Sequence, residues 1–101
     1  MPKLYEYLGI VIFFYSNEHE PVHVHGRYQR LESRATIIIV EGRIVRVEIG
    51  DVGGKRPLEG EKLKDFREFV EARAEEIVER WVAFFVRNER ITPQIITRRI
   101  R

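Results

Sequence analysis

The stretch ATIIIVEGRIVRVEI, residues 35–49, predicts a β-hairpin and with it the sheet on which the chain is built. Residues 35–40 and 43–49 are rich in β-branched side chains, which favour strands. Glu41-Gly42 separates them, and a two-residue loop with glycine is typical of a tight turn between antiparallel strands. The second strand alternates apolar and charged side chains, as a sheet with one buried face requires. Its apolar positions are Val45, Val47 and Ile49, and its charged positions are Arg46 and Glu48.

Upstream of this hairpin, the sequence predicts two further strands. Residues 5–15 form an almost unbroken apolar and aromatic run, which indicates a strand buried on both faces. Residues 16–21 contain serine, asparagine and proline, and these turn formers end the run. Residues 22–28 then alternate with the two-residue period of a strand. The side chains expected on one face are Val22, Val24 and Tyr28, and those expected on the other are His23, His25 and Arg27.

Downstream of the hairpin, a long amphipathic helix is expected. Residues 61–87 contain neither proline nor glycine, and their apolar side chains recur at spacings of three and four. After Asn88, residues 93–100 predict a short edge strand that begins at a proline. The expected fold is therefore α+β, with a small, mainly antiparallel sheet of four to five strands covered by one long C-terminal helix. Residues 1–101 are expected to form a single domain.

Composition excludes several classes of protein. Apolar residues make up 44% of the chain and charged residues 34%, which suits a folded globule with a charged surface rather than a disordered chain. The chain has no cysteine, so disulfides, thiolate metal sites and cysteine catalysis are excluded. A small chain without disulfides is expected in the cytoplasm. The apolar run at residues 8–15 is too short to span a bilayer or to indicate a signal peptide.

The net charge of +2 conceals a basic C-terminal end. Residues 88–101 carry four arginines and one glutamate, so residues 1–87 sum to −1. Such an end can meet phosphate or an acidic partner. A nucleic-acid footprint is usually a larger basic face, so a solvated terminus is the favoured interpretation.

All three histidines fall within seven residues, which makes this segment the candidate site. His23 and His25 share one strand face, and His19 lies in the preceding loop, from which it could supply a third ligand. Glu18 or Glu20 could add an oxygen. Three protein ligands and one open position suit a catalytic divalent metal such as zinc.

A second hypothesis for the same residues needs no metal. His23 and His25 would act as general base and general acid, and Arg27 would stabilise a charged phosphorane during RNA cleavage. Tyr15 or Glu18 could assist. In a third hypothesis the histidines are purely structural and tie residues 16–21 to the sheet. Residue types alone leave all three hypotheses open.

Residues 10–28, IVIFFYSNEHEPVHVHGRY, resemble the signature of a bacterial family, domain of unknown function 4160. That signature is a hydrophobic strand ending in tyrosine, followed by a His-x-Pro-Pro-His-Phe-His string. His19, Pro21, His23 and His25 match it. Val22 and Val24 replace a proline and a phenylalanine without disturbing the histidine frame. The similarity extends over nearly the whole chain, including a helix that carries Trp81.

The resemblance implies a protein partner, and it does not imply a particular enzymatic activity. Members look like small bacterial proteins, often encoded beside another small domain of unknown function, number 2442, in an arrangement similar to a toxin–antitoxin pair. The first functional hypothesis is therefore an interaction module that binds a small protein encoded nearby. The alternatives are the histidine-dependent ribonuclease or metal-assisted hydrolase, and the structural role. The apolar end of the predicted helix adds a homodimer to the expected partners.

Overall fold

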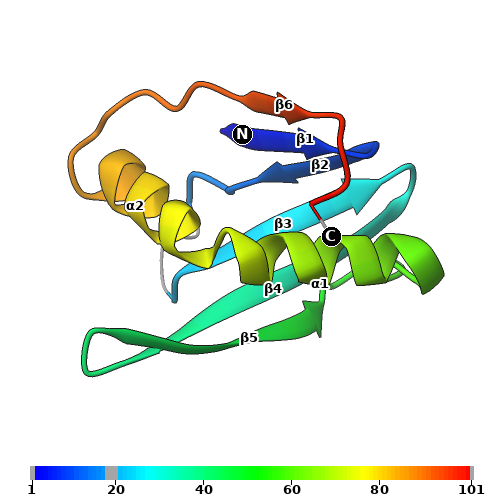
Figure 1. Cartoon of the computed structure of the whole chain (residues 1–101), viewed down its shortest axis with the longest axis horizontal. Helices are drawn as coiled ribbons and strands as arrows, with labels where there is room; N and C mark the ends of the chain where they lie inside the picture. Colours follow the sequence, from blue (N-terminus) through cyan, green and yellow to red (C-terminus); the bar gives the residue numbers. More distant parts are fainter. Residues whose placement is uncertain (1, 18–20, 101) are drawn as a thin grey trace.

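A computed structural model describes residues 2–17 and 21–100, in which six strands form one sheet and two helices pack on one of its faces (Figure 1). The strands lie side by side in the order β5-β4-β3-β2-β1-β6. They are β1 (Lys3–Tyr7), β2 (Ile10–Phe13), β3 (His23–Tyr28), β4 (Leu31–Val40), β5 (Arg43–Asp51) and β6 (Gln94–Ile96). The helices are α1 (Gly60–Ala72) and α2 (Ala74–Phe85). The predicted α+β class is confirmed.

The first five strands form an antiparallel meander, and three of its connections are tight turns that contain residues with positive φ. The predicted turn at Glu41-Gly42 is confirmed, and both residues have positive φ angles, 51° and 77°. The single strand predicted over residues 5–15 is wrong, because Leu8 and Gly9, with φ of 50° and 86°, reverse the chain between β1 and β2. Leucine rarely adopts this conformation, so the apolar run hid the turn.

The C-terminal strand completes the sheet at the opposite edge from β5. β6 pairs in parallel with β1, so the sheet is mainly but not wholly antiparallel. The edge strand predicted over residues 93–100 is present as Gln94–Ile96. The expected four to five strands thus become six in the described residues, because the predicted N-terminal strand is two strands.

The helical segment is also divided, where one long helix is predicted. Arg73, with φ −110° and ψ 15°, interrupts the helical backbone between α1 and α2. Hydrogen bonds from the amide of Arg73 to Phe69 and from Ile77 to Arg73, both 2.9 Å, keep the two helices continuous in space. No proline or glycine marks the break. Both helices bury side chains against the sheet, Phe66, Phe69 and Val70 from α1 and Ala74 and Ile77 from α2.

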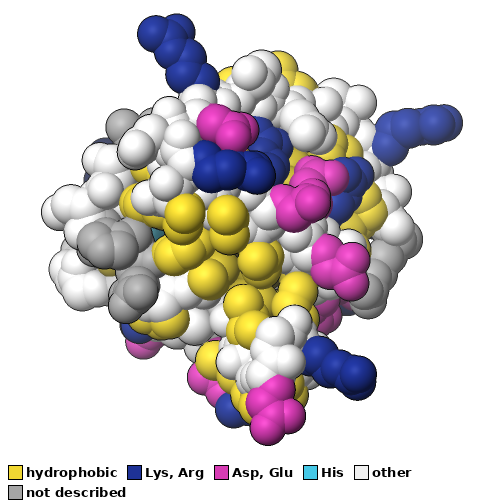
Figure 2. Space-filling view, turned by 90° about the vertical axis from the view of Figure 1, so that its left-hand side faces the viewer, with side chains coloured by type: hydrophobic (Ala, Val, Ile, Leu, Met, Phe, Trp, Pro, Cys, Tyr) yellow, Lys and Arg dark blue, Asp and Glu magenta, His cyan; other side chains and the backbone are white. Residues whose placement is uncertain are grey.

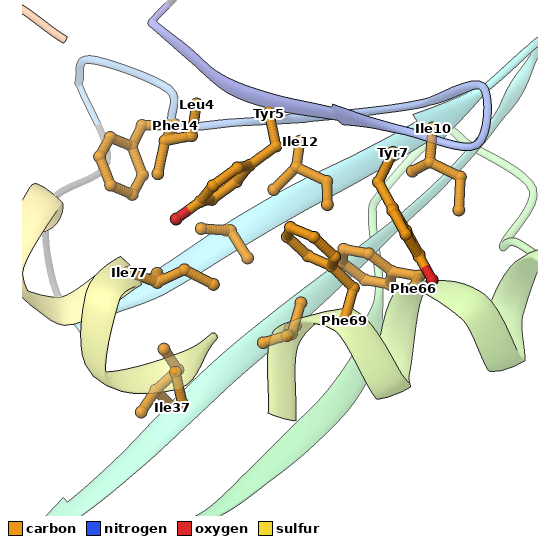
Figure 3. Close-up of a cluster of buried hydrophobic side chains, with 14 of the residues drawn as sticks. Leu4, Tyr5, Tyr7, Ile10, Ile12, Phe14, Ile37, Phe66, Phe69 and Ile77 are labelled. Atoms are coloured by element: carbon orange, nitrogen blue, oxygen red, sulfur yellow. The ribbon is translucent and has the colours of Figure 1, made fainter. Parts of the chain in front are cut away.

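The core lies between the helices and the sheet (Figure 3). Aromatic side chains of β1 meet α1, with the ring centroids of Tyr5 and Tyr7 at 4.9 and 4.5 Å from that of Phe69. The Tyr5 hydroxyl donates a hydrogen bond to Glu76. Burial, followed by this contact with Glu76, raises the pKa of Tyr5 above its ordinary value. The phenol is therefore neutral in the folded protein at neutral pH.

The C-terminal end is docked onto the helix layer, which differs from the solvated terminus favoured above. The Arg99 guanidinium donates a hydrogen bond to the buried carboxylate of Asp65 on α1. The amide of Ile100 donates to the Tyr7 hydroxyl over 3.1 Å. One of the four predicted tail cations is thus paired inside the molecule. Neither helix in the described part of the chain has the length and apolar character needed to cross a membrane.

The two layers approach each other closely at Gly26 on β3. A Cβ atom at this position would lie 2.5 Å from Cε1 of Phe66, well inside any real contact distance. Phe66 is fully buried, so its ring has little room to move away. The absence of a side chain at residue 26 thus allows α1 to lie against the middle of the sheet.

We expect Gly26→Ala to lower the free energy of unfolding by about 1–3 kcal/mol, the usual cost of overpacking a core. Denaturant unfolding of the purified protein measures it. Gly53→Ala is the matched control, because Gly53 has no positive φ and a Cβ there would meet nothing within 4 Å. Equal stability of the two variants would contradict the proposed packing constraint.

Candidate functional site

The predicted alternation of residues 22–28 is confirmed, and it separates the core side of β3 from the histidine side. Val24 is fully buried in the core, and Gly26 faces α1. His23, His25 and Arg27 therefore point to the opposite face, because successive strand residues alternate. Both described helices lie on the core side (Figure 1). His23 and His25 are nevertheless only 5% and 3% exposed, so they are buried rather than spread over a solvated face.

Glu32 of β4 is the centre of this cluster. The β3–β4 register places Glu32 directly opposite Arg27 and two residue pairs from His25, on the same face of the sheet. Its side chain is 1% exposed, and its two carboxylate oxygens face different partners. Nδ1 of His25 lies 3.1 Å from Oε2, and Nε of Arg27 donates to Oε1 over 3.2 Å. A buried carboxylate needs such partners, because desolvation of an unpaired charge costs several kcal/mol.

Tyr15 adds a third donor from the segment that follows β2. Its hydroxyl donates to Oε2 of Glu32 over 3.1 Å. Burial, and next the hydrogen bond to Glu32, raise the pKa of Tyr15 above its ordinary value. The hydroxyl therefore stays protonated through neutral pH and remains a hydrogen-bond donor.

Aromatic rings hold the His25 imidazole in place. Phe13 of β2 stacks on it with ring centroids 5.5 Å apart, and Tyr15 meets it edge-on at 4.5 Å. The Arg27 guanidinium carbon lies 4.9 Å from the centroid of Phe13, within cation–π distance. Phe13 itself is fully buried, so one apolar ring supports both the imidazole and the cation. The aromatic side chains therefore restrict the orientations available to the His25 imidazole and the Arg27 guanidinium.

Hydrogen-bond partners determine which nitrogen of each imidazole carries the proton. Nδ1 of His23 lies 2.6 Å from the carbonyl oxygen of Pro21, which can only accept. Nδ1 of His25 faces the Glu32 carboxylate, which also accepts. Both rings therefore carry hydrogen on Nδ1, and in the neutral rings the lone pair lies on Nε2. The two ring centroids are 5.3 Å apart.

Comparison with known proteins identifies the family to which the chain belongs. The family model described as Domain of unknown function (DUF4160) matches residues 9–82, which include β2, β3, β4 and both histidines of the cluster. The chain belongs to this family. No curated protein and no solved structure matches the chain.

The three metal ligands predicted for this DUF4160 protein are not all placed by the structure. His23 and His25 come together, whereas His19, Glu18 and Glu20 lie outside the described residues. Within residues 2–17 and 21–100, no three histidine or carboxylate side chains are arranged to hold a metal. His23 and His25 would supply two nitrogen ligands, and a third would have to come from residues 18–20.

The DUF4160 site contains one residue that the sequence analysis missed. Glu32 lies before residue 35, where the third strand is predicted to begin, so the sequence pattern did not place it opposite Arg27. The signal was present, because a two-residue turn at Gln29-Arg30 pairs residue 28 with 31 and residue 27 with 32. The predicted catalytic trio of His23, His25 and Arg27 is brought to one face, and Glu32 and Tyr15 join it.

Proposed function

We propose that the protein is the effector of a two-component, toxin–antitoxin-like bacterial pair, and that it cleaves RNA with the histidines around Glu32. The hydrogen bond between His25 Nδ1 and the buried Glu32 carboxylate carries the proposal. It orients the imidazole and would stabilise the imidazolium form, which is the role of the carboxylate in histidine-dependent hydrolases. The toxin–antitoxin context comes from the family resemblance.

In the proposed reaction, Nε2 of His25 takes the proton from a ribose 2′-hydroxyl. The 2′-oxygen then forms a bond to phosphorus while the bond from phosphorus to the 5′-oxygen breaks. His23 in its protonated form gives its proton to that leaving oxygen. The products are a 2′,3′-cyclic phosphate and a free 5′-hydroxyl, so atoms and charge balance without a co-reactant.

Cations on the same face support an anionic substrate. The Arg27 side chain is 36% exposed although it contacts Glu32, so it can also meet a phosphate at the surface. Arg34 of β4 pairs in register with His25 and is exposed beside it. Arg27 would stabilise the negative charge that develops on the phosphorane.

We expect His25→Asn to lower the rate of RNA cleavage by roughly 10²-fold or more, the usual contribution of a general base. Asparagine retains a donor near the position of Nδ1 and removes Nε2, so the contact with Glu32 survives while the base is lost. Gel analysis of a labelled single-stranded oligoribonucleotide, with detection of the cyclic phosphate, measures the rate.

Two controls separate chemistry from structure. A matched deoxyoligonucleotide lacks the 2′-hydroxyl and is expected to remain intact. Arg46→Ala removes an exposed cation of β5 and is expected to leave the rate unchanged. If His25→Asn lowers the melting temperature but the wild type cleaves no RNA, the histidines are structural, and the proposed reaction is wrong.

A metal-assisted hydrolase is the second candidate, favoured by the same Nδ1 hydrogen bonds. Metal-binding histidines usually donate the second ring nitrogen to a carboxylate or a backbone carbonyl, as His23 and His25 do. A divalent metal such as zinc would then bind the two Nε2 atoms and His19, leaving an open position for water.

For this candidate we expect about one zinc, nickel or manganese ion per chain in untagged protein. We further expect the melting temperature to fall after treatment with a chelator, because a metal bound only to the folded state stabilises it. Elemental analysis and thermal unfolding measure both, and His19→Ala should lower the metal content. Metal-free protein with an unchanged melting temperature would leave only the acid–base reaction.

The interaction-module part of the proposal rests on an apolar surface at one end of the molecule. Figure 2 faces the end that holds α2 and the β4–β5 hairpin, and it shows hydrophobic side chains gathered across the middle of this view and continuing toward its lower tip. Ile39 and Val40 of the hairpin are 39% and 52% exposed. A groove between the hairpin and α2 includes Ile44 and Val78 in its lining. Exposed apolar surface of this kind is typical of a protein-binding site.

We expect Val40→Asp to weaken a complex with the small protein encoded nearby at least about tenfold, since it places a charge in the contact. Co-expression followed by calorimetry of the purified pair measures the affinity. Ile95→Asp is the matched control, because Ile95 is 70% exposed on β6, at the other edge of the sheet. A complex that forms equally well with both variants would exclude this surface, and the absence of any complex would exclude the pairing.

A further inference from the structure

We propose that the outer edge of β5 binds β5 of a second copy of this chain, antiparallel about a twofold axis at Val47. In the part of the chain that the structure describes, β5 ends the sheet and has no strand on its outer side. It is nine residues long, whereas β6 at the opposite edge has three. A long edge strand presents unpaired amide and carbonyl groups and is a template for another strand.

The charged side chains of β5 are complementary to those of an antiparallel copy of the same strand. With Val47 opposite Val47 of the second copy, Arg46 faces Glu48 and Glu48 faces Arg46. Cross-strand pairs of opposite charge stabilise a sheet. Both side chains are exposed, at 59% and 51%, so they are available to a second molecule while they also contact each other within the strand.

Neighbouring registers lack this complementarity. If the twofold axis passed through Arg46 or through Glu48, that residue would face its own copy, and like charges directly opposite each other are destabilising. Registers shifted by a single residue would place side chains of opposite faces against each other. Among these registers, the one centred on Val47 is therefore favoured by charge.

Apolar side chains of the same strand support the pairing. Val45 is 53% exposed and would lie beside Ile49 of the second copy in this register. A groove along the edge includes Ile44, Val45 and Val47 of β5 and Ala74 at the start of α2 in its lining. The register shift between Ile38 and Ile39 of β4 leaves Val45 as an extra residue of β5 with no partner on β4. The regular pairing centred on Val47 therefore spans residues 46–48, with Val45 and Ile49 at its ends. Such a short contact predicts a dimer that depends on concentration.

This dimer is independent of the histidine chemistry, and charge reversal tests it. We expect the wild type to sediment as a concentration-dependent dimer, and Arg46→Glu or Glu48→Arg alone to raise the dissociation constant roughly tenfold or more. Each single variant places like charges opposite each other. An equimolar mixture of the two variants restores opposite charges in every cross-strand pair, so it should dimerise as the wild type does.

Arg67→Glu, a charge reversal at an exposed position of α1, is the control for the change in net charge and should leave the dimer intact. At concentrations where the wild type is monomeric, the melting temperatures of all variants are expected to match it, because the altered side chains are exposed. A wild type that remains monomeric at the highest soluble concentration overturns the proposal. Single variants that dimerise normally, or a mixture that fails to dimerise, overturn the register and with it the assigned interface.

Discussion

The approach of Phe66 to Gly26 is the contact on which the arrangement of the site depends. It brings α1 against the centre of the sheet at a point where any side chain would exclude it. Once Gly26 faces the helix, the two-residue period of β3 directs His23, His25 and Arg27 to the other face. A slip of one residue would place the histidines in the core and Val24 outside, at a large cost in buried apolar surface. Packing on one face of the sheet thus fixes the chemistry on the other.

The buried carboxylate of Glu32 is costly for stability, which is why it indicates function. Apolar residues of similar volume often stabilise a fold as well as a buried ion pair or better. Here three donors converge on one carboxylate, two from β3 and one from the segment after β2. Perturbed and buried polar groups of this kind gather at functional sites. The fold itself gives no reason for an imidazole, a guanidinium and a phenol to share one carboxylate at that position.

Most of the sheet could be predicted from local patterns, because turn chemistry and alternation are local. The Glu41-Gly42 hairpin and the two faces of residues 22–28 follow directly from them. Leu8-Gly9 was missed because leucine is a poor signal for a left-handed turn and lies inside an apolar run. The break at Arg73 has no local signal, since alanine and arginine are good helix formers and no proline or glycine lies nearby.

The candidate site was predictable only in part, for a related reason. His23, His25 and Arg27 lie within five residues of one strand, so their common face is a local property. Glu32 joins them through the register of two strands, and Tyr15 through the path of the chain after β2. Residue types alone do not reveal these contacts, and the spacing from Arg27 to Glu32 becomes informative only once the turn at Gln29-Arg30 is assigned. Pairing across strands must be assigned before a partner on the next strand can be recognised.

The proposed reacting groups and the proposed dimer interface lie on different strands of the sheet, β3 and β5. β3 has a hydrogen-bonded neighbour on each side, so its backbone is held more firmly than a loop would be, and reacting groups require such positioning. β5 has one neighbour and can accept a second. A twofold axis perpendicular to the sheet at β5 would extend the sheet in its own plane and leave the face of β3 uncovered. Both histidine clusters would then lie on the same side of a continuous sheet, where one extended polyanion could reach the two of them.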